Sequence, residues 1–447
     1  MGVAVQHAAR HGRAGAVHRP LVRAEPARRL SHPATGLASL RPVWPILVGA
    51  ATVLSLSLGL RQSLGLFMPP ITLGPQSIGI SVADFTAAVA VQNLAWGLLQ
   101  PLAGAWAARM GFRPLMLAGA ALYVAALLLL ASAQGLLAVM LGAGVMIGAS
   151  LACTGSALTL SVATRVVPPA SRSLVLGVVS AMGSLGAMIA APIGQTLSAE
   201  HGWRWGVLGF ALLALVMLPA AWVAGRADKV PLPAPAAGTA DGSTARQVVR
   251  QALHHVPFLV MSGAYFVCGM QLVFLTTHLP AYLAICGMDP MLSAQALGMI
   301  GGFNVLGSLF FGWAGGRWNK QVLLGLLYSA RSLVLAGYFI AAPTPTSTLV
   351  FAAVMGFLWL GVAPLVAGSV AEMFGLRWQA MVQGLAFFSH QMGSVLGAFG
   401  GGLMFAWLGN YELAWRLGVG LGLAAGLVQI LVAVGRPPPA TGRLVPA

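Results

Sequence analysis

Two arginines stand inside long apolar runs, where a charged side chain is unexpected. Arg61 lies in the run 43–68 and Arg331 in the run 321–341. An arginine near the centre of a membrane-spanning helix costs about 2.5–3.5 kcal/mol on insertion scales, so it usually faces a cavity or a partner. Because a guanidinium offers a planar fork of donors that matches a carboxylate, each arginine is a candidate anchor for an organic anion. The alternative for Arg61 is an interfacial arginine whose charge reaches the lipid headgroups.

The acidic residues are placed where they cannot neutralise these arginines. No carboxylate falls in the middle of an apolar run, where it could hold a cationic cargo or carry a proton through a buried site. A carrier of cations therefore fits badly, and a carboxylate on a substrate is the natural partner of an unpaired arginine. The eight acids fall in predicted tails, loops or helix ends: Glu25, Asp84, Glu200, Asp228, Asp241, Asp289, Glu372 and Glu412.

Histidines and amides supply the other polar groups at membrane depth. Histidine changes charge near physiological pH, so His278 and His390 could couple proton movement to an anion; the alternative is a histidine bonded into helix packing. Amides inside lipid more often bond neighbouring helices than ligands. Asn93 and Asn304 are the preferred pair because they lie in the corresponding second and eighth runs. The predicted substrate-binding set is Arg61, Gln62, Asn93, Gln271, His278, Asn304, Arg331, His390 and Gln391.

The elements that carry these residues are predicted from composition. With 58% hydrophobic and 7% charged residues, the chain is not a water-soluble globular protein. A bilayer core needs roughly twenty apolar residues per helix, and the long continuous runs exclude a barrel. We predict an all-α membrane protein with twelve transmembrane helices in two six-helix bundles. The predicted spans are 43–68, 84–106, 114–133, 137–163, 173–197, 205–225, 256–284, 292–315, 321–341, 348–370, 380–405 and 413–434.

The basic residues predict the orientation. The net charge is +16, but the 24 Lys and Arg are scattered between apolar runs and form no nucleic-acid-binding face. Most of them fall in segments on the same side as the N-terminus, whereas the opposite side carries Arg204 and Arg416. By the positive-inside rule, both termini are predicted to be cytoplasmic.

The chain divides into two related halves. A Pro/Gly/Ser-rich stretch within 226–255 predicts a flexible cytoplasmic linker between the bundles 43–225 and 256–434, flanked by a disordered basic cytoplasmic tail 1–42 and a cytoplasmic tail 435–447. Met182-Gly-Ser184 recurs as Met392-Gly-Ser394, and Trp203-Arg-Trp-Gly-Val recurs as Trp415-Arg-Leu-Gly-Val. This duplication predicts two bundles around a midplane cleft. Glycine repeats at 393, 397 and 401 and at 418, 422 and 426 allow close helix contact, either for rocking of the bundles or for static packing.

The segment Gly104-Ala-Trp-Ala-Ala-Arg109-Met-Gly111-Phe-Arg113 resembles the loop signature of the major facilitator superfamily, and Gly312 to Lys320 resembles its counterpart. Ala108 and Gly316 stand where that signature usually has Asp, which pairs charges during gating. The resemblance implies a gating-loop set of Gly104, Arg109, Gly111, Arg113, Gly312 and Arg317. Three further segments resemble bacterial members of the monocarboxylate and oxalate/formate transporter group: Arg61 to Pro70, Thr277 to Tyr282, and Ser389 to Ser394.

Together these features predict a secondary transporter of a small organic anion, a monocarboxylate, working by alternating access with proton symport or anion exchange. Motifs for nucleotide binding and catalysis are missing, and the three cysteines match no metal site, so we expect neither an enzyme nor a cofactor. The resemblance implies a monomer in the inner membrane. The main alternative is efflux of a neutral or apolar compound; a multipass membrane enzyme and a non-transporting sensor are the others.

Overall fold

The computed structural model describes residues 37–73, 75–232 and 243–435. Most of the predicted tail 1–42 and nearly all of 435–447 therefore lie outside the described residues. The end of that first tail, Leu37–Val43, forms a 3-10 helix (η1) that leads directly into the first spanning helix.

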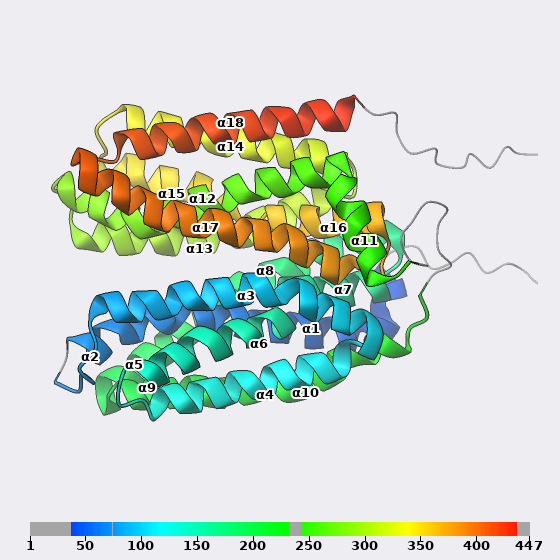
Figure 1. Ribbon diagram of the computed structural model, residues 1–447, viewed down its shortest axis with the longest axis horizontal. Helices are drawn as coiled ribbons and strands as arrows, with labels where there is room; N and C mark the ends of the chain where they lie inside the picture. Colours follow the sequence, from blue (N-terminus) through cyan, green and yellow to red (C-terminus); the bar gives the residue numbers. More distant parts are fainter. Residues whose placement is uncertain (1–36, 74, 233–242, 436–447) are drawn as a thin grey trace, which may run out of the picture. The chain divides into compact units, whose positions relative to one another are not determined.

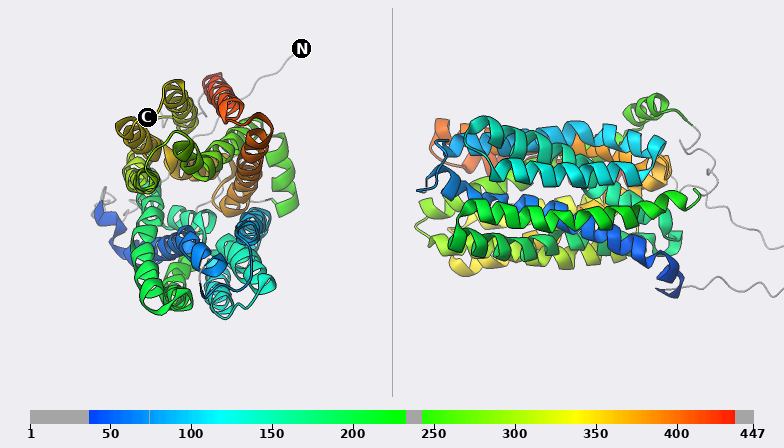
Figure 2. Two further views of the ribbon diagram at one scale, coloured as in Figure 1. Left: turned by 90° about the vertical axis from the view of Figure 1, so that its left-hand side faces the viewer. Right: turned by 90° about the horizontal axis from the view of Figure 1, so that it is seen from below.

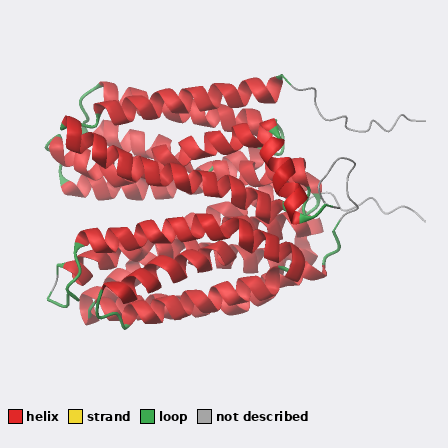
Figure 3. Cartoon of the chain, in the orientation of Figure 1, coloured by secondary structure: helices red, strands yellow, loops and turns green. Residues whose placement is uncertain are grey.

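The described residues are almost entirely helical, and none of them forms a strand (Figures 1 and 3). Before the linker, the elements are α1 (Trp44–Ser63), η2 (Leu64–Phe67), α2 (Met68–Thr72), α3 (Val82–Met110), α4 (Phe112–Ala131), α5 (Leu136–Val139), the π-helix η3 (Met140–Met146), α6 (Ile147–Thr154), α7 (Ser156–Val166), α8 (Pro169–His201), α9 (Trp203–Leu215), α10 (Met217–Ala224) and η4 (Gly225–Lys229). After η4 come α11 (Ala245–His254), α12 (Val256–Ile285), α13 (Pro290–Ala314), α14 (Lys320–Ile340), α15 (Pro345–Trp359), α16 (Val362–Phe374), α17 (Gln379–Leu408) and α18 (Glu412–Val434).

Eleven helices of the described chain are long and apolar enough to cross a membrane. The remaining helix of the predicted twelve is α17, which is 30 residues long but carries Gln379, Gln383, Ser389, His390 and Gln391. These polar side chains lower its hydropathy without shortening it. The prediction of a twelve-helix membrane protein is confirmed, and α17 carries the predicted site residues His390 and Gln391.

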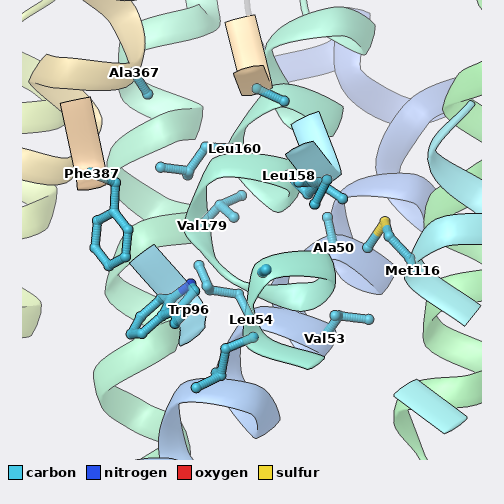
Figure 4. Packing of buried hydrophobic residues seen from close by; sticks show 14 of the residues in the cluster. Ala50, Val53, Leu54, Trp96, Met116, Leu158, Leu160, Val179, Ala367 and Phe387 are labelled. Atoms are coloured by element: carbon cyan, nitrogen blue, oxygen red, sulfur yellow. The ribbon is translucent and has the colours of Figure 1, made fainter. Parts of the chain in front are cut away.

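The helices pack in two groups, one on each side of the linker. In the first group α1 lies against α8 and α10, and α4 lies against α9; in the second, α12 lies against α17 and α14 against α18. Apolar side chains from α1, α4, α7 and α8 fill the first group, as Figure 4 shows for Leu54, Met116, Leu158 and Val179. Contacts between the groups are made mainly by α3 with α17 and by α8 with α13.

The start of α1, the linker helix α11 and the end of α18 lie at the same end of the helices, which we call the linker end (Figures 1 and 2). The opposite end, where α2, α5 and α9 lie, is called the far end. The helix ends that lie at the linker end carry Arg109, Arg113, Arg165 and Arg172, whereas Arg204 and Arg416 lie near the starts of α9 and α18, at the far end.

The linker is more structured than its composition predicts. We expected a flexible segment over 226–255, but 225–229 forms η4 and 245–254 forms α11. Thr244 and Gln247 form a capping box at the start of α11, and Val248 and Ala252 are fully buried. A cap and a buried apolar stripe are enough to stabilise a short helix against the bundle. Residues 233–242 lie outside the described residues.

The two glycine repeats lie inside the second group and not between the groups. A Cβ at Gly393 would lie 1.9 Å from the carbonyl oxygen of Phe266 in α12, and a Cβ at Gly422 would lie 2.0 Å from Oγ of Ser332 in α14. These repeats therefore let α17 approach α12 and α18 approach α14. Their positions fit static packing within one group and not a contact surface for rocking of the two bundles.

Candidate functional site

The contact between α3 and α17 is built on glycines toward the linker end. A Cβ at Gly104 would lie 2.3 Å from the backbone nitrogen of Met381, and a Cβ at Gly384 would lie 2.8 Å from that of Pro101. Nearer the middle of the helices, a Cβ at Gly97 would lie 2.9 Å from Cβ of Gln391. Only glycine permits this approach of two backbones, so the two groups touch closely from Gln391 to the linker end.

A second glycine contact joins α8 to α13 at the same end. A Cβ at Gly177 would lie 2.7 Å from Cα of Gly312, and a Cβ at Gly312 would lie 2.5 Å from Cα of Gly177. Gln379 of α17 adds a hydrogen bond between the groups, since its Nε2 donates to Oγ1 of Thr164 in α7 at 3.1 Å. The linker end is thus closed on both sides of the molecule.

Beyond Gln391 the same faces lose their partners. Residues three or four apart share one face of a helix, so the α3 face of Gly97 and Asn93 continues through Ala90 and Thr86, both exposed. On α17 the face of Gln391 continues through Val395 and Phe399, which are 41% and 74% exposed. On α13 the face of Gly312 continues to Gly301 and Gly298, where an added Cβ would meet no atom within 4 Å. From this loss of contacts we infer that the two groups separate toward the far end, and that a crevice opens there with its floor at Asn93 and Gln391.

Arg61 lies at this floor and joins the two groups through Asn93. Its guanidinium Nη2 donates to Oδ1 of Asn93. Gln391, from the second group, donates through Nε2 to the backbone oxygen of Asn93 at 3.0 Å and to its Oδ1 at 3.3 Å. The Nε of Arg61 is buried and has no hydrogen-bond partner. One arginine, one asparagine and one glutamine thus form a network that spans α1, α3 and α17.

Aromatic rings surround this network. The Cζ of Arg61 lies 5.1 Å from the Trp96 ring centroid, within the range of a cation–π contact. Trp96 lies against Phe387 of α17 with ring centroids 4.5 Å apart, as Figure 4 shows. Phe387 stacks on His390 at 5.6 Å, and the Tyr265 ring of α12 lies 4.5 Å from the same histidine. Trp96 and Phe387 were not predicted as site residues, because an aromatic residue in an apolar span is typical of the packed core.

No carboxylate pairs with Arg61 among the residues that the structure describes. The hydrogen bond it makes is to a neutral amide, and the charge remains without a counter-ion. A buried cation with a donor left over can bind an anion that enters from the crevice.

Arg331 lies elsewhere and is fully satisfied by neutral groups. Its side chain is 0% exposed within the second group. It donates to Oε1 of Gln271 at 3.0 Å and to the backbone oxygen and sulfur of Cys268 at 3.3 and 3.4 Å. Gln271 in turn donates to Ser332 at 3.0 Å and to the backbone oxygen of Gly418 at 2.8 Å. The structure does not bring Arg331 or Gln271 to the Arg61 network.

The remaining predicted residues are dispersed. His278 bonds through Nε2 to the backbone oxygen of Ala398 at 2.9 Å, inside the second group. Asn304 accepts a hydrogen bond from the backbone N–H of Leu360 at 3.0 Å, at the interruption of the helix between α15 and α16. Gln62 is exposed on α1. Of the predicted set, Arg61, Asn93, His390 and Gln391 come together.

Among the predicted gating residues, Gly104 and Gly312 form the inter-group contacts described above, and Gly111 is the turn between α3 and α4. Gly111 has φ +90°. Arg113 lies over Trp222 at 4.4 Å, Arg317 lies over Trp313 at 4.2 Å, and Arg109 is exposed.

The loop signature lacks its usual acidic residues in this chain, but acidic side chains from other segments lie at the linker end. The two carboxylate oxygens of Asp228, in η4, accept hydrogen bonds from the backbone N–H groups of Phe112 and Arg113 at 2.8 and 2.9 Å. Glu372 of α16 pairs with Lys320 at 2.5 Å, and α16 packs against α8 of the other group. Neither role was predicted, because both partners are distant in the sequence.

Comparisons with known proteins agree with this architecture. The family model described as Major Facilitator Superfamily matches residues 47–398. Monocarboxylate transporter 13 of Rattus norvegicus is 25% identical over 374 residues, covering 83% of this chain and 84% of that protein. The proton:xylose symporter XylE, bound to 6-bromo-6-deoxy-D-glucose, superposes with a TM-score of 0.66 at 12% identity over 89% of this chain and 96% of its own. FucP in the outward conformation gives 0.64 at 15% identity over 88% and 99%. The chain therefore belongs to the major facilitator superfamily and is a membrane transporter, not an enzyme.

Proposed function

We propose that this transporter moves a small organic anion, a monocarboxylate, by alternating access, and that Arg61 anchors its carboxylate. The observation that carries the proposal is a positive side chain at the floor of the crevice with a donor unused and no acid beside it. Charge-assisted hydrogen bonds from a guanidinium to a carboxylate are about twice as strong as neutral ones. A carboxylate would therefore gain more here than a neutral solute of equal size.

The relatives support the same substrate class. Monocarboxylate transporter 13 matches most of the chain, and the name of that protein states what it transports. At 25% identity this relationship supports the class of cargo and not a particular acid.

The arrangement of the two groups supports a sidedness for the described state. The linker end, with most of the basic connections, is assigned to the cytoplasm by the positive-inside rule. The crevice then opens outward, and in a bacterial cell the membrane is the inner one. Coupling by proton symport or by anion exchange is part of the same proposal, with His390 as the titratable group beside the network, next to Gln391 and stacked on Phe387.

Efflux of a neutral or apolar compound is the competing proposal, and one observation favours it. Arg61 already bonds Asn93 and contacts Trp96, so its role could be to hold α1 against α3. Under this alternative, the network is architecture and no cargo carboxylate touches it.

Counterflow in proteoliposomes separates the two proposals. Labelled propionate is exchanged against unlabelled mono- and dicarboxylates, with and without a pH gradient, for the wild type, Arg61→Gln and Arg416→Gln. Arg416 is a matched control because it is 63% exposed and pairs with Glu412 on its own helix. Removing one partner of a buried hydrogen-bonded charge pair costs about 2 kcal/mol or more, so Arg61→Gln is expected to weaken the apparent affinity at least about thirtyfold. Full propionate exchange by a folded Arg61→Gln variant would contradict the anchor role.

A further inference from the structure

The walls of the crevice differ in chemistry from its floor. On α3 the crevice face carries Ala90 and Thr86, and the Thr86 hydroxyl is already bonded to the backbone oxygen of Val82 at 2.9 Å. On α17 it carries Val395 and Phe399, both exposed. These side chains offer apolar surface and no charge above the Arg61 network.

The other two helices that line the crevice, α8 and α13, also face it with apolar residues and glycines. On α8 the face that touches α13 through Gly177 reaches Met188 about three helical turns further on, and this methionine is 59% exposed. On α13 the opposing face has no side chains at all at Gly301 and Gly298, where open space extends beyond 4 Å from an added Cβ. Beside α13 the crevice is therefore open at these two glycines, where backbone takes the place of a side-chain wall.

A second carboxylate would find no cation in this space. Arg331 is the other arginine at membrane depth, and it is 0% exposed with its donors bonded to Gln271 and Cys268. A cargo with charges at both ends would place one of them among Ala90, Val395 and Phe399. Burying an unpaired carboxylate on closure is costly, whereas burying methylene groups is favourable.

We propose that the cargo is a carboxylate with one charged end and an apolar body, and that Gly301 and Gly298 of α13 provide the room for that body. This inference rests on the proposed anchoring of the carboxylate by Arg61. It makes Gly301 and Phe399 residues that determine specificity: the glycine sets the width available to the body, and the phenylalanine covers it from α17. Longer monocarboxylates bind better than short ones until the body extends past these walls, and dicarboxylates of equal length bind poorly.

Ligand-induced thermal stabilisation of the purified full-length protein tests the inference. This assay needs no vesicles, so passive leak of fatty acids across a bilayer does not affect it. The probes are acetate, butanoate, hexanoate and octanoate, with adipate as the six-carbon dicarboxylate, at a pH where all are ionised. Each added methylene is expected to improve the affinity by up to about fourfold. Adipate is expected to bind at least tenfold more weakly than hexanoate.

Two variants locate the body of the cargo. Gly301→Leu fills the open space beside α13 and is expected to reduce the ratio of hexanoate to acetate affinity at least tenfold. Gly420→Leu is the matched control, because Gly420 is an exposed helical glycine of α18 that also has no atom within 4 Å of an added Cβ. If Gly301→Leu does not fold, Gly301→Ala tests the same space with a smaller effect.

The outcomes distinguish this inference from the proposed function. Affinity that does not change with chain length, adipate binding equal to hexanoate, or equal ratios in Gly301→Leu and Gly420→Leu would each overturn the inference while Arg61-dependent binding survives. If no carboxylate stabilises the protein or competes with propionate, the anchor proposal itself fails.

Discussion

The glycine contact between α3 and α17 predicts that one methyl group can shift the transport cycle. Gly104→Ala places a Cβ 2.3 Å from the backbone nitrogen of Met381 and 2.4 Å from the carbonyl carbon of Ala380. Both neighbours are backbone atoms, so no side-chain rotation relieves the overlap. The two groups must move apart at the linker end, which is the movement that opens this end.

The size of the shift follows from two opposing effects. Overpacking of a tight contact typically costs about 1–3 kcal/mol, which changes a two-state ratio by roughly 5- to 150-fold. Alanine in place of glycine within a helix stabilises α3 by about 1 kcal/mol in both states. We therefore expect Gly104→Ala to keep its overall stability while the population open at the far end decreases at least about fivefold relative to the state open at the linker end.

Cysteine accessibility measures this ratio. Thr86→Cys reports on the far end of α3, in a background where Cys153, Cys268 and Cys286 are replaced by serine, and its rate of modification by a membrane-impermeant maleimide follows the open population. Gly337→Ala is the matched control, because an added Cβ at this helical glycine of α14 meets nothing within 4 Å. Equal modification rates in the Gly104→Ala and Gly337→Ala proteins would refute the claim that this contact keeps the linker end closed.

Three further substitutions test single interactions. Asp228→Ala removes the acceptor for two backbone N–H groups at the start of α4 and should lower the unfolding free energy by about 0.5–2 kcal/mol, with Asp228→Asn recovering part of it in thermal unfolding. Asn304→Ala leaves the N–H of Leu360 unpaired at the break between α15 and α16; it should cost about 1–3 kcal/mol, and a change in substrate affinity without a change in melting temperature would contradict this helix-capping role. Arg331→Met should lower the melting temperature, since it removes the donors that bond Gln271. The affinity for propionate should stay within about threefold of the wild type. Loss of affinity in a stable protein would instead place Arg331 at the cargo.

The architecture could be predicted from the sequence because hydrophobic length alone distinguishes spanning helices from loops. The twelve spans follow from the apolar runs, and Arg61 was conspicuous because a charge in hydrocarbon is rare. Its lack of an acidic neighbour also follows from the positions of the eight acids. Binding roles for Arg61, Asn93, His390 and Gln391 stay predictions until cargo is measured.

What the sequence could not provide are relationships between distant segments. Asn304 and Asn93 look equivalent in the two halves, but Asn304 caps a helix break that becomes visible only when α15 and α16 are placed. Arg331 was the second candidate anchor after Arg61, yet its guanidinium donates a hydrogen bond to Gln271, which lies in another helix. Charge and hydropathy identify unusual residues, whereas the partner of each depends on which helix faces which.

The polar character of α17 has a consequence for how the chain enters the membrane. The amides and hydroxyls of α17 weaken its partition into lipid, and its glycines fit against α12, which is synthesised earlier. Ser389 of α17 also donates to the backbone oxygen of Ser262 in α12 at 2.7 Å. We infer that α17 enters the membrane by packing against α12, which is already inserted, and not as an independent stop-transfer segment. A glycosylation reporter carrying α17 alone should fail to insert, and one carrying α12 to α17 should succeed; efficient insertion of α17 alone would remove this dependence on assembly order.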